Sequence, residues 1–213
     1  MRRMRSPHPV PEPASIVRAV TRHGLEIDLR PVTPDDKPLL ADGFARLSER
    51  ARYLRFLAPA DRLTPAQLAY LSEVDHHDHV AWGALDGGAA AGVARFVRYQ
   101  DEPSSADVAI TVLDAYQGRG VGRTLLEVLG VSARARGISQ FHFDVLSENA
   151  AMLGLLSSFG ATRTDEGEVV HLVADVARFP APTIVEGDLV GLLEFASRQA
   201  SAGSSSKLSE LTQ

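Results

Sequence analysis

Apolar and polar positions begin to alternate, or to repeat at helical spacing, at about residue 24. The run "GLEIDLRPV" (24–32) alternates as a half-buried strand does. Thr33 can then cap a helix that has Pro34 at its first position. Apolar residues at helical spacing extend this predicted helix to about Ser48. The segment "LTPAQLAYLSEV" (63–74) repeats the Thr-Pro opening and predicts a further helix.

The middle of the chain predicts strands joined by short turns. "HVAWGALD" and "AAAGVARFVRYQD" flank Gly87 and Gly88, which indicates an antiparallel hairpin. "ADVAITVLD" is a third strand, and a helix from about Gly120 to Ala135 follows, closed by Gly137. A strand "SQFHFDVLS", a short helix "ENAAMLGLLSSFG" and a last hairpin complete the series. This order predicts an α/β (α+β) domain over residues 24–178, with a mixed, mostly antiparallel sheet and helices on both faces.

The flanking segments have a different composition. Residues 1–23 are basic and proline-rich, which predicts a disordered lead-in. In residues 179–200, apolar positions at helical spacing predict a C-terminal helix that packs on the domain, and a cap over the active-site mouth is the alternative. Residues 201–213 have linker composition, and we expect a disordered tail.

Overall composition excludes several classes of function. The chain has 213 residues, 45% hydrophobic and 23% charged, which is typical of a globular domain. Its formal net charge of −5 argues against a nucleic-acid partner. The absence of cysteine excludes disulfides and thiolate nucleophiles and fits a reducing cytoplasm. No segment has the length of a signal-peptide core or of a membrane span, so we expect no membrane partner.

The glycine cluster "QGRGVGR" (117–123) is the clearest chemical signal. A helix N-terminus exposes unpaired N–H groups and positive potential, and glycines let an anion approach the backbone. This arrangement predicts a phosphate site. A Walker loop is excluded because its lysine is missing, and a dinucleotide fold is opposed by the G-x-G-x-G spacing and by the preceding hairpin.

The loop "QGRGVG", the strand "AITV" upstream of it and the helix start "ENAAM" resemble the GNAT family of N-acetyltransferases over residues 24–178. "YLSEVDHHDH" and "ARFVR" are further similar to the catalytic domain of mycobacterial-type protein lysine acetyltransferases. In some of those proteins a cyclic-nucleotide-binding module precedes this domain. Only about 23 residues precede the first predicted strand, so we expect no such module here.

The resemblance implies acetyl-CoA as the cofactor and assigns residues to it. Ile110, Thr111 and Val112 match the strand that pairs with the pantetheine arm, and the N–H of Val112 matches a donor to the thioester carbonyl. Asn149 matches an asparagine that binds the pantetheine end, with a simple helix N-cap as the alternative. The pyrophosphate loop comprises Gln117, Gly118, Arg119, Gly120, Val121, Gly122 and Arg123.

Acetyl transfer to a lysine also needs a proton acceptor, because only about one lysine in a few thousand is neutral at pH 7. Asp107 stands where the lysine-acetyltransferase relatives have a glutamate one methylene longer, so it is the candidate base, and a solvated strand-end carboxylate is the alternative. Asp144 matches a glutamate of other branches and is the second candidate. Leu156 replaces a tyrosine that in many relatives protonates the departing thiolate.

Histidines outside these motifs carry weaker signals. In "DHHDH" (75–79) only His76 and His79 have a spacing suited to a metal, and we expect a polar helix end and no metal site. His142 lies on a strand that borders the acceptor cleft, where a substrate contact and a partly buried structural histidine are both possible.

Together these patterns predict an acetyl-CoA-dependent N-acetyltransferase that works by direct attack, with a protein lysine as acceptor. A small-molecule amine acetyltransferase and a catalytically silent acyl-CoA-binding module are the alternatives. The sequence indicates no oligomeric state.

Overall fold

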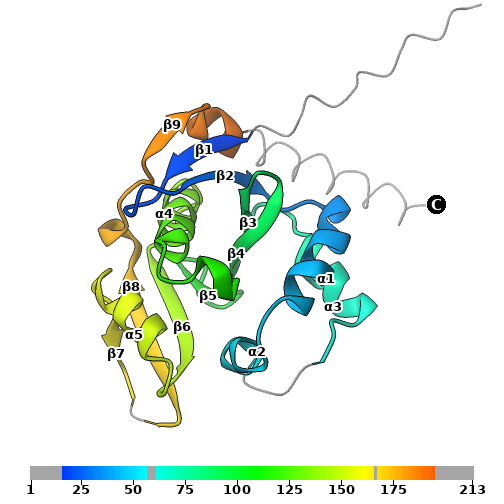
Figure 1. Ribbon diagram of the computed structural model, residues 1–213. Helices are drawn as coiled ribbons and strands as arrows, with labels where there is room; N and C mark the ends of the chain where they lie inside the picture. Colours follow the sequence, from blue (N-terminus) through cyan, green and yellow to red (C-terminus); the bar gives the residue numbers. More distant parts are fainter. Residues whose placement is uncertain (1–15, 57–60, 166, 195–213) are drawn as a thin grey trace, which may run out of the picture.

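The computed structural model describes residues 16–56, 61–165 and 167–194. These residues form one nine-stranded sheet in the order β7-β8-β6-β5-β4-β3-β2-β1-β9 (Figure 1). Neighbouring strands are antiparallel, except that β5 and β6 are parallel. The predicted mixed, mostly antiparallel sheet is therefore confirmed.

The elements follow one another along the chain largely in the predicted order. The strands are β1 (Val17–Val20), β2 (Glu26–Pro31), β3 (His79–Asp86), β4 (Ala89–Arg98), β5 (Ser105–Val112), β6 (Gln140–Leu146), β7 (Thr162–Arg163), β8 (Val169–Asp175) and β9 (Ile184–Glu186). The α-helices are α1 (Lys37–Ala45), α2 (Glu49–Phe56), α3 (Pro65–Ser72), α4 (Val121–Arg134) and α5 (Ala150–Ser157). Three 3-10 helices are η1 (Pro34–Asp36), η2 (Asp114–Tyr116) and η3 (Val176–Arg178).

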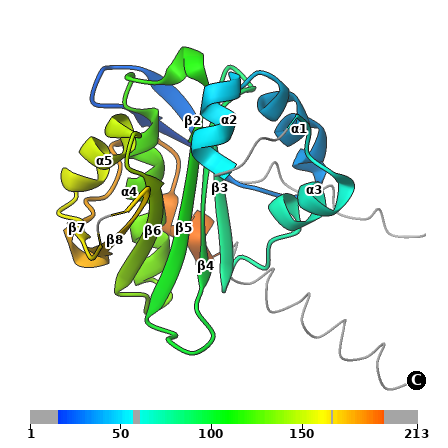
Figure 2. The same cartoon turned by 90° about the horizontal axis from the view of Figure 1, so that it is seen from below.

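Helices cover both faces of the sheet. In Figures 1 and 2, α4 and α5 lie on one side and α1 and α3 on the other. Helix α4 packs against the central strands β3, β4 and β5, and its inner face is fully buried. Trp82 of β3 donates a hydrogen bond from Nε1 to Oγ of Ser132 in α4 at 2.9 Å, which satisfies two polar atoms inside this layer. None of the helices within the described residues has the length and apolar composition to cross a membrane.

Local sequence signals explain where the elements begin and end. The Thr64 side chain accepts a hydrogen bond from the N–H of Gln67, and the Gln67 side chain accepts one from the N–H of Thr64, so α3 starts with a capping box. Gly137 has a φ of +73°, a left-handed conformation that ends α4 as predicted.

Two short strands correct the predicted boundaries. Val17–Val20 forms β1, inside the segment predicted as a disordered lead-in over 1–23, because Val17 and Ala19 are buried against the core. Of that predicted lead-in, residues 1–15 lie outside the described part of the chain. Strand β9 pairs with β1 and lies in the region predicted as a helix over 179–200.

The predicted C-terminal helix starts later than expected. The structure is helical from residue 189 to residue 194, where its description ends, so residues 195–200 and the predicted tail 201–213 lie outside it. The side chain of Asp188 caps this helix by accepting a hydrogen bond from the N–H of Val190 at 3.0 Å. Leu192 and Leu193 are buried in the main core, so the described turn packs on the domain.

The parallel pairing of β5 with β6 is short, and this positions the functional site. Only Ser105, Ala106 and Asp107 pair with β6, opposite Gln140, Phe141 and His142 respectively. Beyond Asp107 the register of β5 continues on the β4 side alone. The edge of β5 that faces β6 is therefore open from residue 108 onward.

Candidate functional site

A groove of about 770 Å³ lies where β5 and β6 separate. This volume falls within the range of about 300–1,000 Å³ that is common for ligand sites. Residues from β5, from β6 and from the N-terminal ends of α4 and α5 form its walls, and α2 adds Arg50, Ala51, Leu54 and Arg55. The groove therefore brings together the glycine cluster, the open edge of β5 and the start of α5.

The backbone of β5 presents donors and acceptors to this groove. The N–H of Leu113 donates to the carbonyl of Ala91 at 3.0 Å, so Leu113 is a hydrogen-bonded partner of β4. In an antiparallel ladder every second residue is hydrogen-bonded to the neighbouring strand, so Thr111 is also bonded to β4. The residues between, Ile110 and Val112, direct their N–H and C=O groups the other way, toward the groove. An extended ligand can add to this edge as a further strand.

Gln117 connects the open edge to the glycine cluster. Its Nε2 donates a hydrogen bond to the carbonyl of Val112 at 3.2 Å. Of the two groove-facing polar groups of Val112, the carbonyl is thus engaged by Gln117, and the N–H remains directed toward the groove. The N–H of Val112 therefore has the direction expected of a donor to the carbonyl oxygen of a ligand in the groove.

The glycine cluster forms the start of α4. Gly118 and Gly120 have φ values of +70° and +89°, a left-handed conformation that favours glycine. The first intrahelical hydrogen bond runs from the N–H of Thr124 to the carbonyl of Gly120 at 3.1 Å. The N–H groups of Val121, Gly122 and Arg123 therefore have no intrahelical partner, and with the helix dipole they make this end of the groove suited to an anion.

The arginines of the cluster contact protein groups. The guanidinium of Arg123 donates to Oγ of Ser158 at 2.5 Å and lies over the ring of Phe159, 4.6 Å from its centroid. Arg119 lies over Tyr116, with 5.5 Å between its guanidinium carbon and the ring centroid. Both arginines supply positive potential near the loop, while the exposed amides supply the direct donors. Arg22, which the sequence analysis did not select, also lines the groove.

Asn149 caps α5, as its simpler interpretation predicted. Its Oδ1 accepts a hydrogen bond from the N–H of Met152 at 3.1 Å. The residue also lines the groove, so its amide nitrogen is available to a ligand there. Leu156, which replaces the tyrosine of many relatives, is fully buried in the core and does not line the groove.

Asp107 lies at the point where β5 and β6 part. Burial raises the pKa of its carboxyl group, and the nearby Asp144 raises it further, while Arg55 of α2 opposes the shift. Asp107 is opposite His142 in the β5–β6 register, so both side chains lie on the same face of the sheet. A half-buried carboxylate with a raised pKa is suited to accept a proton near neutral pH.

Asp144 is hydrogen-bonded to a histidine that the sequence analysis missed. Its Oδ1 lies 2.8 Å from Nδ1 of His171, a residue of β8, and Nε2 of His171 lies 3.1 Å from Nδ1 of His142. The β6–β8 register sets Asp144 directly opposite His171. Asp144 is therefore the end of a chain of three side chains and not an isolated carboxylate.

Arg55 and Arg95 form a second feature that sequence patterns did not reveal. Both line a small, mostly apolar cavity between α1, α3 and the sheet, next to the groove at Ala109 and Thr111. Arg95 is 4% exposed, and burial, followed by the proximity of Arg55, lowers its pKa to about 10. Two cationic groups thus lie on the face of the sheet that carries Asp107.

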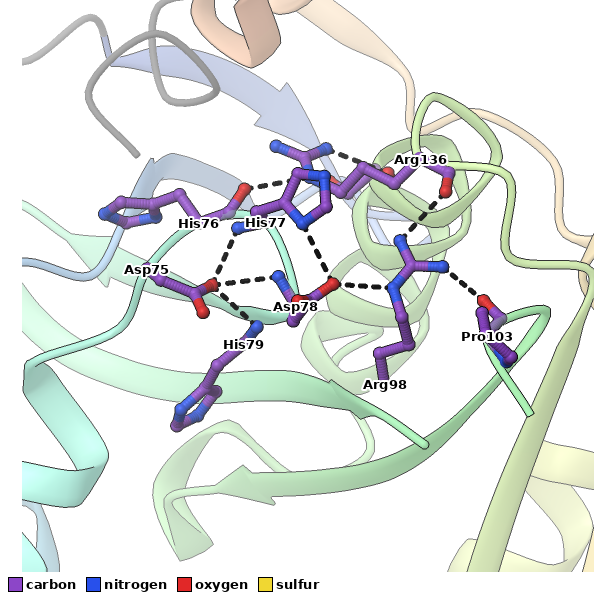
Figure 3. Close-up of polar contacts among 9 residues, drawn as sticks. Asp75, His76, His77, Asp78, His79, Arg98, Pro103 and Arg136 are labelled. Carbon is purple, nitrogen blue, oxygen red and sulfur yellow. Dashed lines mark hydrogen bonds and ion pairs between the residues drawn. The ribbon is translucent and has the colours of Figure 1, made fainter. Parts of the chain in front are cut away.

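The segment "DHHDH" forms a turn held by backbone contacts. Oδ1 of Asp75 accepts hydrogen bonds from the N–H groups of His77, Asp78 and His79 (Figure 3). Arg98 and Arg136 tie this turn to the β4–β5 loop and to the end of α4. In Figure 3 the imidazoles of His76 and His79 do not converge. Within the described residues, no group of three or more metal-ligand side chains is arranged around a common point.

Comparison with known proteins matches this architecture. Residues 45–161 match the model of the acetyltransferase (GNAT) family. Over 176 residues the chain is 39% identical to acetyltransferase Pat of Mycolicibacterium smegmatis, a match that covers 80% of this chain and 52% of that protein. The chain thus spans about half the length of that relative.

Solved structures show the same fold. The GNAT domain of S. lividans PAT superposes with a TM-score of 0.72 and 33% identity, covering 75% of this chain and 96% of that one. A cAMP-binding acyltransferase from Mycobacterium smegmatis superposes with a TM-score of 0.60 and 34% identity, covering 87% of this chain and 54% of that one.

Proposed function

The chain belongs to the GNAT family of acetyltransferases, and on this premise we propose that it transfers an acetyl group from acetyl-CoA to an amine by direct attack. We further propose a protein lysine side chain as the acceptor. One observation carries the proposal. The separation of β5 and β6 joins an open strand edge and a helix N-terminus suited to an anion in a single groove, and the half-buried carboxylate of Asp107 lies on β5 where this separation begins.

The residues of this groove fit acetyl-CoA. The amides of Val121, Gly122 and Arg123 are suited to its diphosphate, with Gln117, Gly118, Arg119 and Gly120 shaping the loop. The polar groups of Ile110 and Val112 are suited to its amide-containing arm, and Thr111 holds this edge against β4. The amide nitrogen of Asn149, a residue that lines the groove, adds a donor. When bound, acetyl-CoA supplies a thioester whose carbonyl carbon accepts the amine.

The side chains supply the remaining chemistry. Asp107 faces the acceptor amine and removes its proton, directly or through water, which typically contributes about 10²–10⁴-fold to the rate. The N–H of Val112 is the candidate donor to the thioester oxygen. No tyrosine protonates the thiolate from the position of Leu156, and a thiol of ordinary pKa near 8.5 can leave without that help.

A small-molecule amine is the second candidate acceptor. The buried guanidinium of Arg95 lies in the wall of an apolar cavity beside Ala109 and Thr111, and such a cavity suits an amine that also carries a carboxylate. Asp107 and Asp144, on the same face, favour a cationic side chain such as lysine.

An assay of the coenzyme A thiol released during turnover distinguishes a lysine acceptor, a small-molecule acceptor and a silent binding module. With acetyl-CoA, we expect turnover of lysine-containing peptides or proteins to exceed turnover of a panel of free amines and amino acids. Turnover of amines alone would select the second candidate. Binding of coenzyme A in calorimetry without turnover of any acceptor would identify a silent binding module, and absence of binding would remove the proposal.

A further inference from the structure

Three side chains on the acceptor face form a continuous hydrogen-bonded chain. Asp144 of β6 contacts His171 of β8 over 2.8 Å, and His171 contacts His142 of β6 over 3.1 Å. The rings of His142 and His171 are 5.3 Å apart between centroids and tilted by 39°. The next neighbour on this face is Asp107, which is opposite His142 in the β5–β6 register. The chain therefore runs from the candidate base toward the outer strand β8.

The direction of each hydrogen bond follows from the chemistry of the end group. An ionised carboxylate only accepts, so His171 must donate to Asp144 from Nδ1–H. A neutral imidazole has one donor and one acceptor nitrogen, so Nε2 of His171 accepts, and His142 must donate to it from Nδ1–H. Nε2 of His142 is then a bare lone pair. Asp144 thus sets the tautomer of a histidine that it does not touch.

The free end of this chain is buried, and its other end is exposed. Nε2 of His142 is inaccessible to solvent and has no hydrogen-bond partner among the described residues. The side chain of Asp144 is 56% exposed and that of His171 is 32% exposed. A buried polar atom without a partner is costly and therefore points to a role in binding or catalysis. The three hydrogen-bonded side chains thus connect a buried proton-accepting atom, Nε2 of His142, to groups that are exposed to solvent.

We propose that the proton that Asp107 removes from the acceptor amine passes to Nε2 of His142, and that His171 and Asp144 are positioning residues that hold His142 in the required tautomer. The inference rests on the proposed transfer to an amine. One N–H bond of the acceptor ammonium breaks, and one N–H bond forms at His142. The imidazolium returns its proton to solvent before the next turnover, so the proton balance is closed.

The groups around His142 favour this role. Burial and the neighbouring His171 lower the pKa of His142, so its imidazole is neutral and able to accept a proton at neutral pH. Asp107 of β5, Asp144 of β6 and Glu102 of the β4–β5 loop oppose the shift and stabilise the imidazolium once it forms. Tyr99, the residue that follows β4, contacts the ring edge-on with 5.2 Å between centroids.

The tautomer of His142 can be measured in the free protein, without any catalytic turnover. In ¹⁵N spectra of the free protein we expect His142 to be protonated at Nδ1 and bare at Nε2, with its signals identified by their loss in His142→Gln. Asp144→Asn replaces a group that can only accept with an amide that can accept or donate, so the direction of the chain is no longer fixed and the His142 signals should move toward a mixture of tautomers. A matched control is Asp165→Asn, since the Asp165 side chain accepts a hydrogen bond from the backbone N–H of His171, at 2.7 Å, and among the described residues it contacts neither histidine ring.

Kinetics then test the role. We expect His142→Gln to lower kcat by roughly tenfold or more, with unchanged acetyl-CoA affinity, and to move the acidic limb of the pH profile of kcat/KM to lower pH. Asp144→Asn should lower kcat and shift the same limb in the same direction, because loss of the carboxylate weakens the base. Asp165→Asn should do neither.

Two outcomes would overturn the inference. One is an Nε2–H tautomer of His142 in the free protein. The other is a wild-type rate and pH profile in a folded His142→Gln variant that still binds acetyl-CoA. A wild-type protein that binds acetyl-CoA and acetylates no amine would instead overturn the proposed function, and the tautomer measurement would still stand by itself.

Discussion

Asp107 and Asp144 lie on one face of the sheet, and they differ in their surroundings. Asp107 is half-buried at the parting of β5 and β6, and burial raises its pKa, followed by the effect of Asp144. The Asp144 side chain is 56% exposed and accepts a hydrogen bond from His171. Asp144 lines the groove, whereas Asp107 lies beside it. Because a general base must exchange a proton near neutral pH, the raised pKa of Asp107 makes it the better candidate of the two.

The raised pKa of Asp107 predicts opposite effects on activity and stability. The folded protein keeps the Asp107 proton to higher pH than the unfolded chain does, so ionisation of Asp107 lowers stability as the pH rises through its raised pKa. Asp107→Asn removes that cost at neutral pH. We expect this variant to melt at a higher temperature and to lose about 10²-fold in kcat, with unchanged acetyl-CoA affinity in calorimetry.

Asp101→Asn is the matched control, because Asp101 is an exposed carboxylate of the β4–β5 loop. It should change neither the melting temperature nor the rate. An Asp107→Asn variant with the wild-type rate would remove Asp107 as the base and transfer that role to Asp144 or to His142.

At the scale of elements, the function depends on how α4 begins. Gly120 combines a φ of +89° with close packing, since an added Cβ would lie 3.0 Å from Cβ of Thr21 in the β1–β2 turn. Gly137, at the other end of α4, has a φ of +73° and no atom within 4 Å of an added Cβ. The two glycines therefore share the same backbone restriction but have different neighbours.

This difference predicts separable effects of two alanine substitutions. Both variants should lose about 1–2 kcal/mol of folding free energy from the left-handed backbone. Only Gly120→Ala should also weaken acetyl-CoA binding, because it displaces the amides of Val121 and Gly122 from the groove end. Calorimetry with acetyl-CoA and chemical denaturation of each variant measure the two quantities. Equal affinities in Gly120→Ala and Gly137→Ala would contradict the assigned anion site.

The elements that the sequence predicted are those with strong local signals. Helix α4 has a long apolar stripe and a terminal glycine, and the β3–β4 hairpin has its Gly87–Gly88 turn. Strands β1 and β9 were missed because they contain four and three residues, too few to show a period. Strand β9 enters the sheet by pairing with β1, which is more than 160 residues earlier in the sequence, and no local pattern records such a contact.

The candidate site was predictable wherever one segment carried the signal. The glycine cluster, Asp107 and Asn149 each lie in a short motif. Arg55 and His171 did not stand out, because each reaches the site from a separate element, α2 and β8. The β6–β8 register alone sets Asp144 opposite His171, and a shift by one residue would move His171 to the other face.

At the scale of the whole molecule, the first and last strands of the described residues, β1 and β9, form the far edge of the sheet. Strand β9 covers β1, and the helical turn that follows inserts Leu192 and Leu193 into the main core. The groove lies on the other side of β4, between β5 and β6. Leu192 and Leu193 are not among the residues that line the groove. The described part of the C-terminal segment therefore supports the fold and leaves the groove uncovered.

This arrangement predicts that the C-terminal turn affects stability and not catalysis. Leu192 is 1% exposed and Val190, on the same turn, is 64% exposed. Leu192→Ala should lower the free energy of unfolding by about 2–5 kcal/mol through lost burial and a residual cavity. Val190→Ala should change it by less than about 0.5 kcal/mol, because its side chain is already in water.

Denaturant titration measures both variants, and thiol release at a temperature where each is folded measures activity. Because the turn packs beyond β1, we expect both variants to keep the wild-type KM for acetyl-CoA and for the acceptor. A folded Leu192→Ala variant with a changed acceptor KM would show that this segment reaches the acceptor side of the groove, and the lid interpretation of residues 179–200 would then replace the packing one.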